Sequence, residues 1–244
     1  MARRIAHEIK NPLTPIQLSA ERLKRRYLKQ ITEDPDTFRQ CTDTIVRQVG
    51  DIGRMVDEFS AFARMPQPVI RPEPLTRIVQ DALVLQREAH QHIQYSSALP
   101  IDPPVAPCDR RLMGQALTNL LANAADAIAM RIAEQPEAPA QGHIRVAIQP
   151  DADGVSISVT DDGIGLPAGE ERERLTEPYV THKQKGTGLG LAIVRKIMED
   201  HGGRLLLADA PDGRGARASL WLPWRAAGDH AMERARATTE PGER

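Results

Sequence analysis

The strongest constraint on the fold is a run of apolar residues that recur every seven positions in the first quarter of the chain. The spacing holds at Phe38, Ile45, Ile52 and Phe59. Thr42, Val49 and Val56 each lie four residues after one of these positions and three before the next. A seven-residue repeat is typical of a helix that packs an apolar seam against another helix. The sequence therefore predicts a long helix in a coiled coil or a helical bundle.

A basic segment before this repeat predicts a partner helix. Pro12 and Pro15 remove backbone donors, so we expect them to interrupt and bend that helix after its first turns. An acidic turn at residues 33–36 follows, with Asp36 as the expected N-cap of the second helix. A hairpin of two helices leaves much of its seam exposed, which a second copy would cover in a dimeric four-helix bundle. The alternative is that the hairpin packs on the rest of its own chain.

Prolines at positions 66, 68, 72 and 74 predict the domain boundary. We expect a dimerisation hairpin over residues 1–65, a stiff linker over 66–74, a second domain over 75–225, and a disordered tail over 226–244. In the second domain, helical patterns occur at 75–90, 109–133 and 189–198, and strand patterns at 93–98, 143–148, 155–160, 205–208 and 216–222. Asp109 is the expected cap of the longest helix. This segregation predicts an α+β fold.

Composition excludes several classes of protein. The chain has 32 basic and 33 acidic residues, so it has no overall positive field to collect nucleic acid or acidic lipid. No apolar run reaches the ~20 residues needed to span a bilayer, and no signal peptide is present, which predicts a cytoplasmic chain without direct membrane contact. Cys41 and Cys108 lie far apart in the sequence, which suggests neither a disulfide framework nor a zinc site.

Three glycine clusters lie in the second domain, at residues 161–165, 186–190 and 213–215. The middle cluster opens a predicted helix, where free amides and the helix dipole attract phosphate. It lacks the Gly-Lys-Ser/Thr of a Walker loop, and no strand runs into it as in a dinucleotide fingerprint. Taken alone, each cluster favours a tight turn that needs a positive φ over a binding loop.

Polar residues near these clusters suit a bound nucleotide. Asn119 and Asn123 are four residues apart and share one helix face, and an amide oxygen suits Mg²⁺ that keeps phosphate and water ligands. Such a pair is also common as a bridge between helices. Asp161 follows a strand and is placed to accept a hydrogen bond from a base. Lys183 and Lys185 precede the middle cluster, where a mobile segment would bring cations to a triphosphate.

The order of these motifs resembles the ATP-binding domain shared by gyrase, heat-shock chaperones, MutL and sensor histidine kinases, an α/β sandwich. The motifs are Asn-Leu-Leu-Ala-Asn-Ala from 119, Asp-Asp-Gly-Ile-Gly from 161, Glu-Pro-Tyr from 177, Gly-Thr-Gly-Leu-Gly-Leu from 186 and Gly-Arg-Gly from 213. Residues 7–15, His-Glu-Ile-Lys-Asn-Pro-Leu-Thr-Pro, are similar to the phosphoacceptor box of sensor histidine kinases. Residues 2–22 and 177–181 most resemble the NtrY-type nitrogen-regulation kinases, and the likeness covers residues 2–224.

The resemblance implies roles for individual residues. His7 would be the phosphorylated residue, Glu8 its acid/base neighbour, and Asn11 the residue that positions water in a phosphatase reaction. Asn123 would bind Mg²⁺, Asn119 would lie near the phosphates, and Asp161 would read adenine. The other nucleotide-binding residues would be Gly163, Gly165, Tyr179, Thr181, Lys183, Lys185, Gly186, Thr187, Gly188, Leu189 and Gly190.

Residues 166–187 would form an ATP lid. Tyr179 stands where relatives commonly have phenylalanine, a change that we expect to be tolerated. Asp126 stands where several relatives have a lysine, which leaves His182, Lys183 and Lys185 to supply positive charge near the nucleotide.

The implied activity is ATP- and Mg²⁺-dependent autophosphorylation of a homodimer on His7, followed by transfer to an aspartate on a response-regulator receiver domain. The setting would be nitrogen-related two-component signalling, with phosphatase activity on the same partner. Two alternatives remain at this point: a chaperone- or MutL-like dimeric ATPase clamp, and a kinase-dead dimerising scaffold.

The position of His7, six residues after Met1, predicts that the chain is a fragment or begins at a late start codon. The second helix continues its apolar seam to Phe59 and Phe62 and needs a longer partner than the first helix offers. We therefore expect a weaker dimer than a longer parent would form, and a parent anchored in the inner membrane by its sensor region.

Overall fold

In the computed structural model, the described residues are 2–63, 65–134, 141–180 and 188–224, and the description of side chains begins at Glu8. The predicted disordered tail, residues 226–244, lies outside them. The chain divides into two compact units. The first comprises Met1–Pro66 with Tyr179–Leu189, and the second comprises Gln67–Pro178 with Gly190–Arg244.

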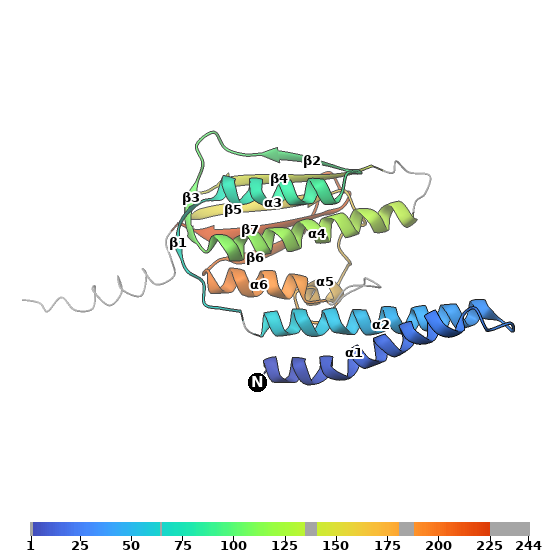
Figure 1. The fold of residues 1–244 in the computed structure, drawn as a ribbon. Coiled ribbons are helices and arrows are strands. Elements are labelled where there is room, and N and C mark those ends of the chain that lie inside the picture. Colours follow the sequence, from blue (N-terminus) through green and yellow to red (C-terminus); the bar gives the residue numbers. More distant parts are fainter. Residues whose placement is uncertain (1, 64, 135–140, 181–187, 225–244) are drawn as a thin grey trace, which may run out of the picture. The chain divides into compact units, whose positions relative to one another are not determined.

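The first unit contains a hairpin of two long helices, α1 (Ala2–Tyr27) and α2 (Pro35–Phe62), which lie side by side (Figure 1). The expected interruption at Pro12 and Pro15 is wrong, because α1 runs through both prolines. The expected bend is present, and Figure 1 shows α1 changing direction along its length. Each proline removes one donor, and the remaining backbone hydrogen bonds keep the helix continuous.

The turn between these helices is capped by a different residue from the one predicted. Asp34 Oδ1 accepts the Thr37 N–H at 3.2 Å, whereas Asp36 pairs with Arg39 at 3.1 Å. Pro35 is the first residue of α2, a position that suits proline because no donor is needed there. The helix therefore begins earlier than a cap at Asp36 would allow.

The predicted seam of α2 is only partly buried, because Phe38 and Phe59 are half-buried and the other positions divide into a buried set and an exposed pair. Thr42, Val49 and Val56 are 4%, 7% and 7% exposed, and α1 and α2 are also joined by the ion pairs Lys10–Asp57 and Lys24–Asp43. The exposed pair is Ile45 and Ile52 of α2, and a second series spaced by seven, Ile9, Ile16 and Leu23, is exposed on α1. A single hairpin thus leaves an apolar stripe on each helix uncovered.

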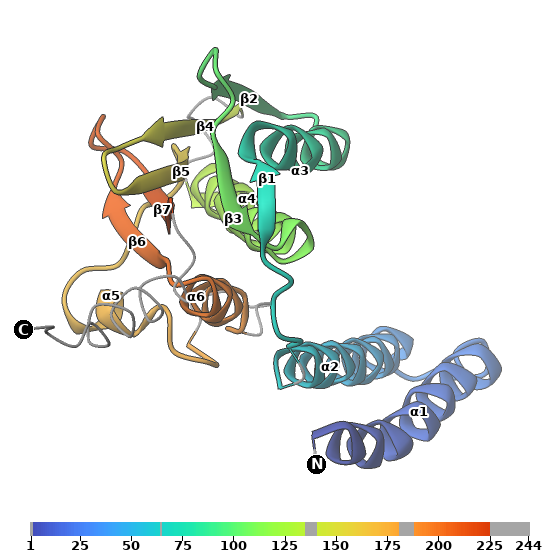
Figure 2. The same cartoon turned by 90° about the vertical axis from the view of Figure 1, so that its left-hand side faces the viewer.

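The second unit is a mixed sheet with helices on one face (Figure 2). Its five strands, in spatial order, are β2 (Ile93–Ala98), β4 (Gly142–Pro150), β5 (Gly154–Asp161), β7 (Ala216–Pro223) and β6 (Arg204–Asp209). Strands β2 and β4 are parallel, and the other neighbours are antiparallel. The helices α3 (Leu75–Ala89), α4 (Arg110–Glu134) and α6 (Gly190–Asp200) cover the sheet. The predicted α+β fold is confirmed.

The core of this unit surrounds α4, which packs against the sheet and against both neighbouring helices. Leu112, Leu117 and Ile128 of α4 are almost fully buried. On β4, Ile144 and Val146 are buried while Arg145 between them is exposed, as expected for a sheet covered on one face. Among the described residues, no helix has the length and apolarity needed to cross a membrane.

Three short elements escaped the sequence analysis. Residues 71–74, assigned to the linker, form β1 (Arg71–Pro74), which pairs antiparallel with β3 (Val105–Cys108). Both strands contain proline, with Pro72 opposite Pro107. Proline is tolerated mainly in edge strands, so its presence in the sequence argued against strands here. In a separate two-stranded sheet both strands are edges, which is why these two can contain proline. The third element is the short helix α5 (Glu170–Arg174).

Candidate nucleotide-binding site

The two asparagines of α4 lie beside the first turn of α6. Asn119 Nδ2 donates a hydrogen bond to the Gly190 carbonyl at 3.4 Å, and a Cβ on Gly190 would lie 3.8 Å from Asn123 Nδ2. Both asparagines are half-buried. The free amides that begin α6 thus lie next to two carboxamides, and a helix N-terminus attracts phosphate. The structure thus brings together three predicted site residues, Asn119, Asn123 and Gly190.

The donor set at this point fits Mg²⁺ bound together with a nucleotide. No cluster of three or more His, Cys, Asp or Glu side chains in the described part of the chain could hold a metal ion by itself. Mg²⁺ often takes one or two protein oxygens and completes its shell with phosphate and water. The side-chain oxygen of Asn123 satisfies that requirement.

Asp161, at the end of β5, has one carboxylate oxygen fixed by the backbone. Oδ1 accepts the N–H groups of Gly163 at 2.9 Å and Ala216 at 3.3 Å, and within the described residues Oδ2 has no hydrogen-bond partner. Burial raises the pKa of Asp161, although the two hydrogen bonds favour its charged form. The carboxyl group is therefore held in place with one oxygen left to accept a hydrogen bond from a ligand.

The adjacent Asp162 has a structural role. Its Oδ1 accepts the His143 N–H at 2.9 Å, and its Oδ2 lies 3.6 Å from Arg131 Nη2. It therefore links the start of β4 to α4. Two neighbouring aspartates that look equivalent in the sequence thus face different surroundings.

One glycine in each outer cluster, Gly163 and Gly215, packs too closely for any larger residue. A Cβ on Gly163 would lie 2.6 Å from Ala127 Cβ, on the face of α4. Gly215 has φ +89°, and a Cβ there would lie 2.0 Å from the Asp161 carbonyl oxygen. These contacts bring the loops after β5 and before β7 against each other and against α4.

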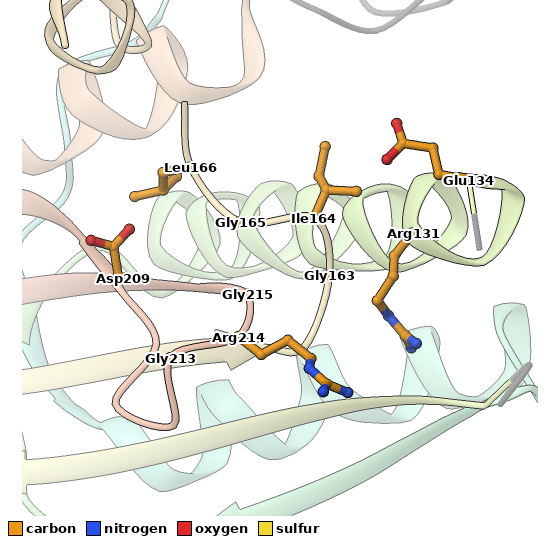
Figure 3. A pocket seen from close by; sticks show the side chains of 10 residues that line it. All are labelled: Arg131, Glu134, Gly163, Ile164, Gly165, Leu166, Asp209, Gly213, Arg214 and Gly215. Carbon is orange, nitrogen blue, oxygen red and sulfur yellow. The ribbon is translucent and has the colours of Figure 1, made fainter. Parts of the chain in front are cut away.

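A cavity of about 450 Å³ lies between these loops and the C-terminal end of α4 (Figure 3). It is lined by Gly163, Ile164, Gly165, Leu166, Gly213 and Gly215, and by the charged residues Arg131, Glu134, Asp209 and Arg214. The Arg131 side chain is 7% exposed and donates to the Gln141 carbonyl at 3.0 Å, while its Nε has no hydrogen-bond partner among the described residues. Arg131 follows Asn123 by eight residues, or ~12 Å along a helix.

The remaining predicted residues are only partly described. Tyr179 donates its N–H to the Gly188 carbonyl at 3.1 Å and adopts φ +69°, and Leu189 is buried. Thr181, His182, Lys183, Lys185, Gly186 and Thr187 lie outside the described residues, so both lysines of the predicted lid do too. His7 is in α1, and its side chain is outside the description. Glu8 and Asn11 are exposed on the same helix.

The sequence analysis missed three residues of this site. Ala127 and Arg131 continue the four-residue spacing of Asn119 and Asn123, so that spacing was a usable signal. Ala216 contributes only its N–H to Asp161, and no side-chain pattern marks such a role.

Comparison with known proteins agrees with this geometry. The family described as histidine kinase-, DNA gyrase B- and HSP90-like ATPase matches residues 108–226. The family described as His Kinase A (phospho-acceptor) domain matches residues 1–68. The second match does not favour a chaperone- or MutL-like clamp.

Similar proteins include the nitrogen regulation protein NtrY of Azorhizobium caulinodans, 57% identical over 91% of this chain. A putative NtrY-like sensor histidine kinase of Rickettsia conorii is 37% identical over 86% of it. The chain spans 28% and 33% of the lengths of these two proteins. The structure of histidine kinase ThkA in complex with response regulator TrrA is 25% identical, with a TM-score of 0.63, over 92% of this chain and 61% of that one. Since it joins a phosphoacceptor domain to an ATP-binding domain of this family, the chain belongs to the sensor histidine kinases and forms a kinase core of the NtrY type.

Proposed function

We propose that this chain transfers the γ-phosphoryl group of ATP to His7 and then to an aspartate of a response-regulator receiver domain. The observation that carries the proposal is the pairing of a phosphoacceptor hairpin with a unit in which Asn119 and Asn123 meet the N-terminus of α6. A scaffold without kinase activity would have no need of two asparagines placed beside a helix N-terminus.

The nucleotide would lie along α4. Oδ2 of Asp161 would accept a hydrogen bond from the adenine amino group, and the glycine loops would admit the base against Ala127. The triphosphate would then extend toward Asn119, Asn123 and the amides of α6. Mg²⁺, held through Asn123, would supply charge neutralisation at the phosphates, and Lys183 and Lys185 of the lid would add positive charge.

Phosphoryl transfer depends mainly on alignment and charge, so the chain must provide a nucleophile at the right place. Near pH 7 a histidine ring is largely neutral and nucleophilic. A carboxylate such as Glu8 can accept a hydrogen bond from one ring nitrogen and make the other a better attacker. The bond from His7 nitrogen to the γ-phosphorus forms as the bond to the ADP leaving oxygen breaks. Asn11, on the same helix, would position water for dephosphorylation of the partner.

The partner and the setting follow from the relatives. ThkA was solved with a response regulator, which supports a receiver domain as the acceptor for this chain. The name of the Azorhizobium protein supports a nitrogen-related signal. The exposed apolar stripes on α1 and α2 support a homodimer of the hairpin.

The proposal is tested with labelled ATP and Mg²⁺. We expect the wild-type chain to gain acid-labile phosphate, His7→Gln to gain none while still binding ATP, and Asn123→Ala to lose Mg²⁺-dependent ATP binding. His92→Gln, a surface change in the second unit, is the matched control and should label like the wild type. Acid-labile phosphate on His7→Gln would reject the assignment. Steady ATP hydrolysis without any phosphoprotein would favour an ATPase instead.

A further inference from the structure

His201 is a buried junction between two helices of the ATP-binding unit. Its ring is 4% exposed, Nε2 accepts the Asp109 N–H at 2.9 Å, and Nδ1 lies 2.7 Å from the Ile197 carbonyl oxygen. The carbonyl can only accept, so Nδ1 donates and the ring is the neutral Nδ1–H tautomer. Asp109 immediately precedes α4 and His201 immediately follows α6, so this ring joins the start of one helix to the end of the other.

Within the described residues, a second polar contact joins the same two helices, the Asn119–Gly190 hydrogen bond. Ten residues separate Asp109 from Asn119 on α4, and eleven separate Gly190 from His201 on α6. At ~1.5 Å per residue both spans are about 15–17 Å, and the helices run in opposite directions. The two contacts therefore fit together in only one register. A slip of α6 by one turn would move Gly190 about 5.4 Å away from Asn119.

Asp109, whose N–H donates to His201, is itself held in place by hydrogen bonds of its side chain. Asp109 Oδ1 accepts the N–H groups of Arg111 at 2.9 Å and Leu112 at 3.1 Å, which caps α4. Its Oδ2 accepts the Val69 N–H at 2.9 Å, just before β1. The ring is thus anchored to a rigid point at the end of α4.

We propose that His201 is a positioning residue for nucleotide binding. Through the Asp109 N–H it sets the register of α6 against α4, and so keeps the first turn of α6 beside Asn119 and Asn123. The ring itself contacts no nucleotide. The inference rests on the nucleotide-binding part of the proposed function and deepens it.

Two amide replacements separate positioning from packing. His201→Gln places its side-chain oxygen where Nε2 accepts the Asp109 N–H. His201→Asn is one methylene shorter, so its amide matches Nδ1 and does not reach Asp109. We expect His201→Asn to raise the Kd for ADP with Mg²⁺ about tenfold, as the loss of one buried hydrogen bond would, and His201→Gln to stay within about threefold of the wild type. Titration calorimetry on the full chain measures Kd, and thermal unfolding gives Tm.

The matched control is Ile93→Ala, a buried residue of β2, which packs on α3 and β4. It should lower Tm and leave the Kd for ADP unchanged. The proposal is overturned if His201→Asn lowers Tm as the control does but binds ADP like the wild type, or if both amides weaken ADP binding equally.

Hydrogen exchange on the wild-type chain provides a second measurement, should His201→Asn fail to fold. Bound ADP should slow exchange of the Asp109 amide, although that amide lies about 15 Å along α4 from Asn119. Unchanged exchange at Asp109 would contradict the proposal. ADP binding without phosphorylation of His7 would overturn the proposed phosphotransfer and leave this inference intact, whereas a wild-type chain that binds no ADP would overturn both.

Discussion

At the scale of single residues, Asp161 and Asp162 show how structure separates two side chains that the sequence presents together. The family resemblance pointed to Asp161, and the structure supplies a physical difference. In the described part of the chain, one carboxylate oxygen of Asp161 has no hydrogen-bond partner, whereas Asp162 has backbone and arginine partners. No local pattern in the sequence contains that difference, because the partners His143, Ala216 and Arg131 come from distant segments.

Replacing Asp161 with asparagine should weaken nucleotide binding and stabilise the fold. The Asp161→Asn amide would offer its N–H₂ or a neutral oxygen in place of a charged acceptor, so we expect affinity for ATP to fall by about 10- to 100-fold. The folded pKa of Asp161 is raised by burial, so its contribution to stability is present at low pH and is lost as pH rises through that pKa. At pH 7 the variant should therefore have a higher free energy of unfolding than the wild type.

The matched control is Asp162→Asn, which removes the charge that faces Arg131 and should lower stability with a smaller effect on affinity. Denaturant unfolding and ATP titration on both variants measure the two quantities. A destabilised Asp161→Asn that binds ATP normally would contradict the account.

At the scale of elements, the sequence predicted those with strong periodicity and missed those defined by pairing. The sheet strands and the long helices lie close to the predicted ranges because alternation and apolar faces are local properties. Strands β1 and β3 owe their existence to each other, and their prolines argue against a strand when each is read alone. The lid prediction stands on the resemblance, since residues 181–187 are outside the description.

The cap of α4 predicts a specific pH dependence. Burial alone would raise the pKa of Asp109, but hydrogen bonds from Val69 and Leu112, with the charge of Arg111, lower it overall. The stability it contributes is therefore present above its unfolded pKa and is lost as pH falls through the folded pKa. Asp109→Ala should cost about 1–2 kcal/mol of unfolding free energy at pH 7, a typical value for a lost N-cap. The cost should shrink at pH 3.

Urea unfolding at the two pH values measures this difference, and the exposed Asp102→Ala is the control, with no change expected beyond about 0.5 kcal/mol. A cost for Asp109→Ala that is equal at both pH values would show that the carboxylate charge is not what stabilises the cap.

At the scale of the whole molecule, the proposal needs the hairpin to find a second copy. Ile45 and Ile52 on α2 are 43% and 40% exposed and lie on one seam with a spacing of seven. Burying two such side chains against a partner contributes about 3–6 kcal/mol to association. The double change Ile45→Glu and Ile52→Glu should therefore weaken the dimer at least tenfold.

Sedimentation across a concentration series measures that change. Val84→Glu, at an exposed apolar site on α3, should leave association unchanged. Equal dissociation constants for the wild type and the double variant would place the dimer contact elsewhere.

The central claim is that the phosphoryl group of ATP arrives on one identified ring. The most direct measurement is to incubate the wild-type chain with ATP and Mg²⁺, digest it at neutral to alkaline pH, and map the phosphate by mass spectrometry. The account predicts a single acid-labile phosphate on His7, within the peptide from α1. Phosphate on any other residue, or none on a chain that has bound ATP, would contradict it.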